Sequence, residues 1–226
     1  MKLSVPDTVV VMPELPEVSP GNPCPFLRGL VAAGHLDGHE EPLSKLSKVV
    51  AQASAGPGQT PLPTLAISAI ALVANGLSPL SLTQRLLGGV HLDGLRNGPL
   101  DKKGAGSRIL DAQGEVDLPE LARLGEFASR KTDDQGHTEL GLDAGQLRTM
   151  MDSNFARAAG ARRFIDRALM DGEWPVLLRV MGKPSATGRY LSLDELGELF
   201  MARRLPERVT QRLPPTPLAA VTRQSA

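Results

Sequence analysis

The scarcity of aromatic side chains restricts the folds open to this chain more than any other feature. Only 3% of its 226 residues are Phe, Tyr or Trp, although 41% are hydrophobic. The core must therefore be built from Leu, Val, Ala, Ile and Met, and that set of residues favours helices over sheets. The length suits one large domain or two small ones.

Apolar residues recur at helical spacing along most of the chain, and no segment alternates as a half-buried strand would. The pattern predicts an all-α fold, a single compact domain of about eight to ten helices. Asp143 and Ser192 are expected to be N-caps, and Glu195 completes a capping box with Ser192. Residues 91–110 are rich in glycine and predicted to be irregular. Helices are expected at 24–33, 42–53, 64–74, 79–87, 118–128, 143–158, 161–170, 173–181 and 192–203.

Proline and the loss of periodicity mark both ends of the chain. Residues 1–22 are expected to form an extended N-terminal arm, residues 23–208 the helical domain, and residues 209–226 a flexible tail. No apolar run reaches the ~20 residues that span a bilayer, and the N-terminus lacks a signal-peptide pattern. A cytoplasmic location without a membrane span is therefore expected.

Charge gives no indication of a polyanionic partner, because 25 Lys and Arg residues balance 25 Asp and Glu residues. No nucleic-acid partner is expected. The basic residues between Arg157 and Arg167 are interpreted as a solvated helix face, with a phosphate or carboxylate site as the alternative. None of the four histidines has neighbours at zinc-ligand spacing, so they are interpreted as ordinary residues; they are His35, His39, His91 and His137.

The chain has one cysteine, which excludes an internal disulfide and a Cys-rich zinc site. Cys24 lies between Pro23 and Pro25, and a proline suits the first position of a helix. Cys24 would then be the N-cap, where free backbone N–H groups favour a thiolate, the form that binds metals. A buried, inert cysteine is an equally good interpretation of this local context.

Three segments, in order along the chain, resemble the chloroperoxidase family, which includes the unspecific peroxygenases. The first is Pro-Cys-Pro at 23–25 with the apolar helix and glycine turn that follow. The second runs from 100 to 114, where Ser107 and Arg108 match the family pattern, with Asp101 at a family Glu position and Lys102 at its His or Gly position. The third begins at Glu173 and ends at the Arg-Leu-Pro of 204–206. Together they cover about residues 20–208 at low identity.

The resemblance implies a haem-thiolate enzyme that oxidises a small organic substrate with hydrogen peroxide. It assigns Cys24 as the axial ligand of haem b, in a helical domain folded around the haem, and Glu173 as the distal acid–base. Arg167 is a candidate for the arginine that some members carry as a second distal group. The remaining contacts to the cofactor are expected from Pro23, Pro25, Lys102 and Ser107.

The family also holds a divalent cation, such as Mg²⁺, against a haem propionate. The resemblance places Asp101 where a carboxylate ligand of that cation stands, and carboxylate oxygens suit such ions. Alternatively, Lys102 or Lys103 pairs with the propionate directly and no cation is needed.

The residues around Glu173 support two interpretations. An acid followed by Trp-Pro-Val-Leu-Leu has apolar neighbours, which raise a carboxyl pKa towards the range useful for proton transfer. A glutamate in the first turn of a helix is also common, because it compensates the helix dipole. The walls of a substrate pocket are expected from Ile67, Ile70, Leu95, Leu100, Val176 and Leu177.

A second class of function remains open at this stage. Residues 111–121 resemble the back half of an EF-hand loop, although Ile109 stands at its first ligand position. The alternative to an enzyme is therefore a non-catalytic helical module that binds haem, or a degenerate EF-hand-like interaction module.

Overall fold

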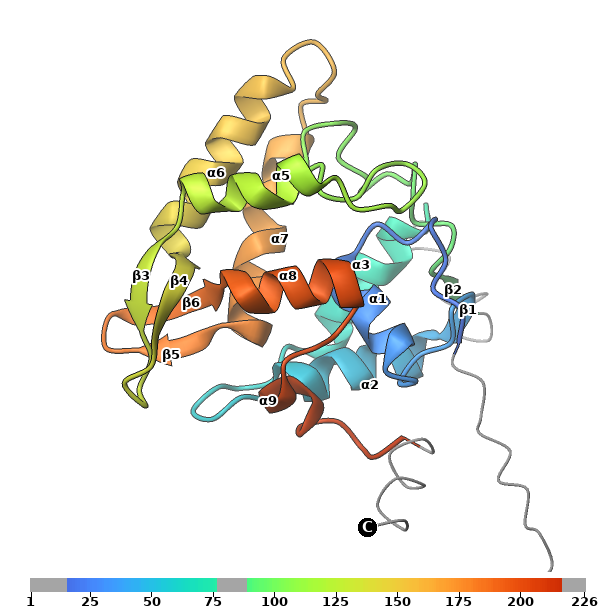
Figure 1. Ribbon diagram of the computed structural model, residues 1–226. Helices are drawn as coiled ribbons and strands as arrows, with labels where there is room; N and C mark the ends of the chain where they lie inside the picture. The colour runs from blue at the N-terminus through green and yellow to red at the C-terminus, as the bar shows by residue number, and fades with distance from the viewer. Residues whose placement is uncertain (1–15, 77–88, 217–226) are drawn as a thin grey trace, which may run out of the picture.

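The computed structural model describes residues 16–76 and 89–216 (Figure 1). Its strands are β1 (Glu40–Pro42), β2 (Gly89–His91), β3 (Ser129–Thr132), β4 (Thr138–Asp143), β5 (Lys183–Ser185) and β6 (Gly188–Ser192). Its α-helices are α1 (Pro25–Ala32), α2 (Leu43–Ser54), α3 (Thr64–Ala74), α5 (Leu118–Ala122), α6 (Ala144–Arg157), α7 (Asp166–Met181), α8 (Leu193–Ala202) and α9 (Glu207–Thr210), and a 3-10 helix, η2, spans Arg123–Glu126.

The prediction of an all-α fold is wrong, because the chain also forms two antiparallel sheets. One pairs β1 with β2, and the other has the strand order β3-β4-β6-β5. None of the described strands exceeds the six residues of β4, and the exposed β3 has the sequence Ser-Arg-Lys-Thr. In β4 only Leu140 and Leu142 alternate with polar residues or glycine, and two apolar residues are too few for a sequence pattern to indicate a strand.

Glycines at turns explain why the second sheet forms hairpins. Gly136, with φ +84°, lies between β3 and β4, and Gly188, with φ +127°, begins β6 directly after the turn from β5. The Asp133 carboxylate accepts hydrogen bonds from the backbone N–H groups of Gln135 and His137, which closes the first turn. In β4, a Cβ at Gly141 would lie 2.3 Å from the Tyr190 ring of β6, so only glycine allows this pairing.

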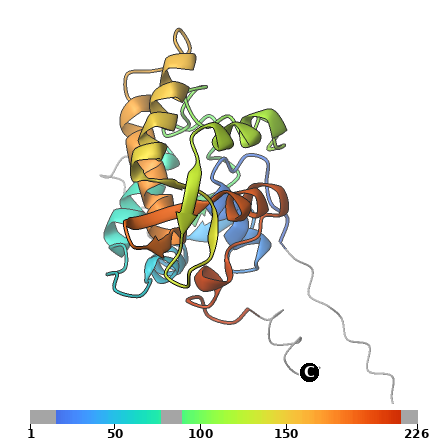
Figure 2. The ribbon, with the colours of Figure 1, turned by 60° about the vertical axis from the view of Figure 1, so that its left-hand side comes forward.

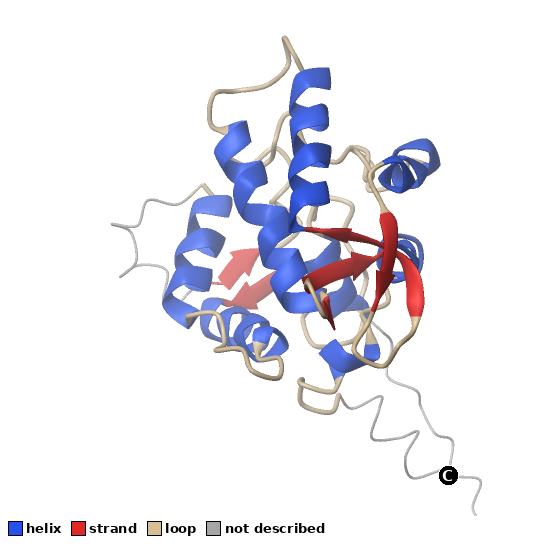
Figure 3. Ribbon diagram, turned by 90° about the vertical axis from the view of Figure 1, so that its left-hand side faces the viewer, coloured by secondary structure: helices blue, strands red, loops and turns tan. Residues whose placement is uncertain are grey.

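The core lies where the helices meet the larger sheet. Helices α6 and α7 pack against each other (Figures 2 and 3). Helix α6 also contacts strand β4, and helix α7 contacts strand β6. Helix α8 packs on both of these strands and on α1. The buried side chains are mainly Leu, Val and Met, as the composition predicted; Leu30, Leu142, Leu196 and Tyr190 are completely buried.

The predicted caps of two helices are confirmed. The Asp143 carboxylate accepts from the Gln146 N–H and the Gln146 side chain returns a bond to Asp143, which forms a capping box on α6. Ser192 accepts from the N–H of Glu195 at the start of α8. The helix predicted at 79–87 lies outside the described residues.

Helix α7 differs from prediction in a way that affects the site. The two helices expected at 161–170 and 173–181 are one helix, α7, with Pro175 inside it. Proline cannot donate to the carbonyl four residues before it, so Pro175 weakens the helix locally but does not end it. Glu173 therefore lies within the helix, and the interpretation as a first-turn glutamate is wrong.

Parts of both predicted end segments pack on the domain. Val18 joins the core from the N-terminal side, while Val209 and Leu213 do so from the C-terminal side. None of the helices in the described ranges is long and apolar enough to cross a membrane.

Candidate functional site

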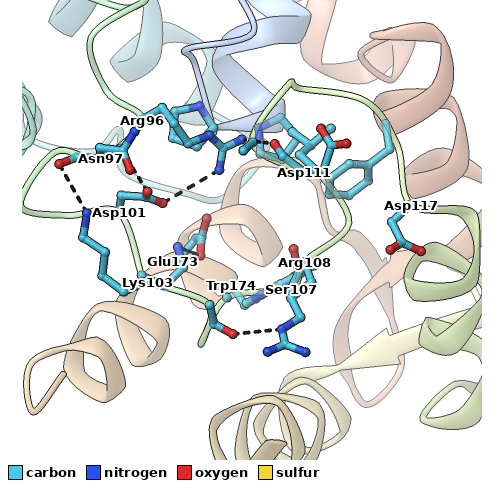
Figure 4. A pocket seen from close by; sticks show the side chains of 18 of the residues that line it. Arg96, Asn97, Asp101, Lys103, Ser107, Arg108, Asp111, Asp117, Glu173 and Trp174 are labelled. Carbon is cyan, nitrogen blue, oxygen red and sulfur yellow. Dashed lines mark hydrogen bonds and ion pairs between the residues drawn. The ribbon is translucent and has the colours of Figure 1, made fainter. Parts of the chain in front are cut away.

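A cavity of about 460 Å³ lies between the N-terminus of α1, the loop before α5, and α7 (Figure 4). Its apolar wall includes Trp174 and Leu177 of α7 and Phe200 of α8. Its polar wall comes mainly from the glycine-rich loop that the sequence predicted to be irregular. A cavity of this size could hold a small molecule, but its wall is more highly charged than the mostly apolar wall of a typical ligand pocket.

The three segments that carry the sequence resemblance meet at this cavity. Pro23 and Pro25 line it from the first segment, Asp101, Lys102, Ser107 and Arg108 from the second, and Glu173 from the third. Of the predicted wall residues, only Leu177 lines it; Ile67, Ile70, Leu95, Leu100 and Val176 do not.

An ion pair between Lys102 and Glu173 joins the loop to α7 in the cavity wall. The Lys102 side chain is 16% exposed and the Glu173 side chain 36% exposed, so the carboxylate remains accessible from solvent. Lys102, which the resemblance aligns with a histidine or glycine, therefore contacts Glu173, which it aligns with the distal glutamate. The sequence alone could not show that these two residues form a pair, because they are far apart along the chain.

Cys24 lies at the edge of this cavity and does not line it. It is the N-cap of α1, with Pro25 at the first helical position as predicted. The residue is partly buried and packs against the hydrophobic core. Both of its neighbours in the chain line the cavity.

Burial raises the pKa of the Cys24 thiol above its ordinary value of 9.0. The backbone N–H groups of Leu27 and Phe26 and the charge of Lys102 lower the pKa, while the charge of Glu173 raises it. Burial outweighs the opposing effects, so the thiol is protonated near neutral pH in the protein without a ligand. Cys24 thus lies close enough to Lys102 and Glu173 for both charges to affect the pKa of its thiol.

The loop over the cavity is held in unusual backbone conformations. Four described non-glycine residues have left-handed φ values, and three of them line the cavity: Asn97 (65°), Lys103 (31°) and Arg108 (61°). Such conformations cost about 1 kcal/mol each and concentrate at binding and catalytic sites. Apart from the glycines of this loop, no sequence pattern indicates these backbone conformations.

A partly buried ion pair fixes this loop to α7. The Arg163 guanidinium bonds to the completely buried Asp166 carboxylate at 2.6 Å and also donates to the Asp101 carbonyl. The Asp101 side chain accepts from the Asn97 N–H at 3.0 Å and lies 3.8 Å from the Arg96 guanidinium (Figure 4). Asp101 therefore has a protein cation beside it, where the resemblance implied a metal ion.

Arg167 is not brought into the cavity. Its guanidinium pairs with Asp152 and Asp171 on the outside of α6 and α7. At about 100° per residue, a separation of six residues places Arg167 and Glu173 about 120° apart around the helix axis. Arg157 similarly pairs with Glu120, so these basic residues form ion pairs on a helix surface.

The described part of the chain contains no group of three His, Cys, Asp or Glu side chains that could hold a metal ion. In the loop compared with an EF-hand, the Asp111 carboxylate accepts from the backbone N–H groups of Gln113 and Glu115 at 2.9 Å. Leu110 and Val116 pair beside it as an isolated bridge. This segment is therefore a closed turn, and the structure gives no support to a calcium loop.

Residues that the sequence did not single out complete the site: Arg96, Asn97, Trp174 and Phe200. Arg96 lies in the irregular loop and Phe200 on a helix far along the chain, so no spacing indicates that they meet. Comparison of the chain with protein-family models, with curated proteins and with solved structures finds no match.

Proposed function

We propose that this cavity binds haem b through Cys24 and that the protein oxidises a small organic substrate with hydrogen peroxide. The observation that carries the proposal is the ion pair between Lys102 and Glu173 in a cavity whose wall also includes Pro23 and Pro25, the neighbours of Cys24. Residues from all three segments that resemble haem-thiolate peroxidases thus line one cavity. The proposal rests on the site and not on the fold, since unrelated folds can carry one chemistry.

The residues present suit haem in three respects. Trp174, Leu177 and Phe200 offer apolar surface to a flat macrocycle. Lys103 and Arg108 offer positive charge to its carboxylates. Cys24 stands at a helix N-terminus between two prolines that line the cavity, and we propose that rotation about its Cα–Cβ bond brings the sulfur in.

Bound haem would supply the iron at which peroxide is reduced, with thiolate ligation favouring cleavage of the O–O bond. Glu173 is the acid–base: its carboxylate takes a proton from one peroxide oxygen and returns it to the other. Lys102 positions this carboxylate through their ion pair. The Cys24 thiol must lose its proton on ligation, and the backbone N–H groups of α1 and Lys102 favour that loss.

Absorption spectroscopy tests the ligand first. Protein produced with added haem is expected to show, as the ferrous–CO complex, a Soret band typical of thiolate ligation. Cys24→Ala should abolish that band. A correctly folded wild-type protein that takes up no haem would contradict the proposal.

Peroxide-dependent turnover then tests the acid–base. Glu173→Gln is expected to lower kcat by about 10²- to 10⁴-fold while haem is retained. Glu126→Gln is the matched control, because Glu126 is 67% exposed in η2 and does not line the cavity. Equal kcat for Glu173→Gln and wild type would exclude Glu173 from the chemistry. Haem-loaded wild type that shows no peroxide turnover would favour the non-catalytic haem protein.

A further inference from the structure

The positive groups around the cavity are less completely paired than the negative ones. Four cations line it, Arg96, Lys102, Lys103 and Arg108, and four carboxylates face them, Asp101, Asp111, Asp117 and Glu173. The formal charges therefore balance, and the difference lies in the partners of each group.

Every carboxylate in the wall has donors from the protein. Asp111 accepts from two backbone N–H groups, and Asp117 accepts from the N–H of Glu120 as the N-cap of α5. Asp101 accepts from the Asn97 N–H and lies near Arg96, while Glu173 pairs with Lys102.

Two of the four cations have no carboxylate partner among the described residues. The Arg108 Nε donates to the Gly104 carbonyl at 3.0 Å, and the Lys103 Nζ donates to the Asn97 carbonyl at 3.4 Å. Neither forms an ion pair in the described part of the chain. A carbonyl satisfies one donor but does not neutralise the charge, so both cations are available to an anion.

Arg96 adds a donor that lacks an acceptor. Its Nη2 donates to the Asp111 carbonyl at 2.9 Å, but its Nε is buried and has no hydrogen-bond partner. A buried donor without a partner is costly, so this Nε can still donate to an acceptor from a ligand or from water.

A buried arginine that does not line the cavity lies near Arg96. Arg28 is 4% exposed and donates to the carbonyls of Asn22 and Gly114. Burial lowers its pKa, the like charges of Arg203 and Arg96 lower it further, and the charge of Glu115 raises it. Like Lys103 and Arg108, Arg28 forms no ion pair with a carboxylate in the described part of the chain.

We propose that Arg96, Lys103 and Arg108 form an anion subsite that binds a ligand carboxylate directly, without a bridging divalent cation. Arg96 takes the place beside Asp101 that a metal ion would otherwise occupy. The left-handed backbone at Lys103 and Arg108 holds both side chains on the cavity wall. The carboxylate can belong to haem, as its propionate, or to a free organic acid, and the two sources are distinguished below.

The first arm of the test uses haem-free protein and the fluorescence of Trp174, which is the only tryptophan and lines the cavity. Octanoate and octan-1-ol are titrated in the presence of EDTA. Octanoate is expected to bind about tenfold more tightly, since charge-assisted hydrogen bonds discriminate at that level. Lys103→Gln and Arg108→Gln should each reduce this preference, and the double variant should remove it.

Arg148→Gln is the matched control, because Arg148 is an exposed arginine on α6 that does not line the cavity. It should keep the full preference for octanoate. Equal binding of acid and alcohol by wild type would overturn the subsite. Octanoate binding that appears only when Mg²⁺ replaces EDTA would overturn the cation-independent part of the proposal.

The second arm titrates haemin and haemin dimethyl ester, which lacks free carboxylates, and follows the Soret band. Haemin is expected to bind about tenfold more tightly than its ester to wild type and equally well to the double variant. Uptake of neither compound, together with a preference for octanoate, would refute the haem function and leave the subsite for a free acid. Equal uptake of haemin and ester would support haem binding and refute the subsite for propionate.

Discussion

Lys102 and Glu173 form an ion pair that joins a glycine-rich loop to the middle of α7. Because the Glu173 side chain is 36% exposed, solvent screens this pair. A double-mutant cycle with Lys102→Met and Glu173→Gln is expected to give a coupling energy of only about 0.5 kcal/mol. Urea unfolding measures it, and 1 M NaCl should reduce it. A coupling several times larger would show that the pair is shielded from water.

The rate at which Cys24 is alkylated should depend on the charges of Lys102 and Glu173. The raised thiol pKa predicts slow alkylation by iodoacetamide near neutral pH and faster reaction after unfolding. Since Glu173 raises the thiol pKa and Lys102 lowers it, Glu173→Gln should move the pH midpoint of alkylation down and Lys102→Met should move it up. Shifts of the same sign in both variants would contradict the geometry.

Glu139 in β4 is expected to be one of the most sensitive residues outside the cavity. Its carboxylate accepts from the Tyr190 hydroxyl at 2.8 Å, the Ser192 hydroxyl at 2.6 Å and the Lys183 ammonium at 2.5 Å. Glu139→Gln leaves the Lys183 charge without this partner and is expected to lower the free energy of unfolding by about 3 kcal/mol. Glu198→Gln, at a side chain 52% exposed, should change it by less than about 0.5 kcal/mol.

The same residue gives a pH dependence with a defined sign. Burial raises the pKa of Glu139, but the bonds from Lys183, Ser192 and Tyr190 outweigh it and bring the pKa below its ordinary 4.5. Its stabilising contribution is therefore complete above pH 4.5 and is lost as pH falls through the lowered value. Urea midpoints measured below pH 4.5 should fall less steeply for Glu139→Gln than for wild type. Parallel curves would show that the pKa of Glu139 is not lowered in the fold.

Two glycines with similar backbone conformations should tolerate alanine differently. At Gly114, with φ +76°, a Cβ would lie 2.6 Å from the Arg28 guanidinium and 2.8 Å from the Pro20 Cα. At Gly136, with φ +84°, a Cβ would meet nothing within 4 Å. Gly136→Ala should thus cost about 1 kcal/mol of backbone strain, and Gly114→Ala at least about 2 kcal/mol. Thermal unfolding compares them, and equal losses would exclude the steric clash.

Local patterns allowed much of the helical structure to be predicted from the sequence. The caps at Asp143 and Ser192 and the proline after Cys24 act within one turn of helix, so their residue types alone indicate where helices begin. The strands were not predictable in this way. Lys183–Ser185 and Ser129–Thr132 become strands only because β6 and β4 lie beside them and complete their hydrogen bonds.

For the candidate site, residue types and their spacing were enough to identify side chains with useful chemistry: a lone cysteine at a helix N-terminus, and Glu173 followed by apolar residues. Which of these groups meet was visible only in the folded chain. Lys102 lies on Glu173, Arg167 lies on the outer surface, and Arg96 lies beside Asp101. Helix caps and apolar spacing are predictable because they are local interactions. Contacts across the cavity depend instead on how the loop folds onto α7, which the partly buried Arg163–Asp166 pair fixes.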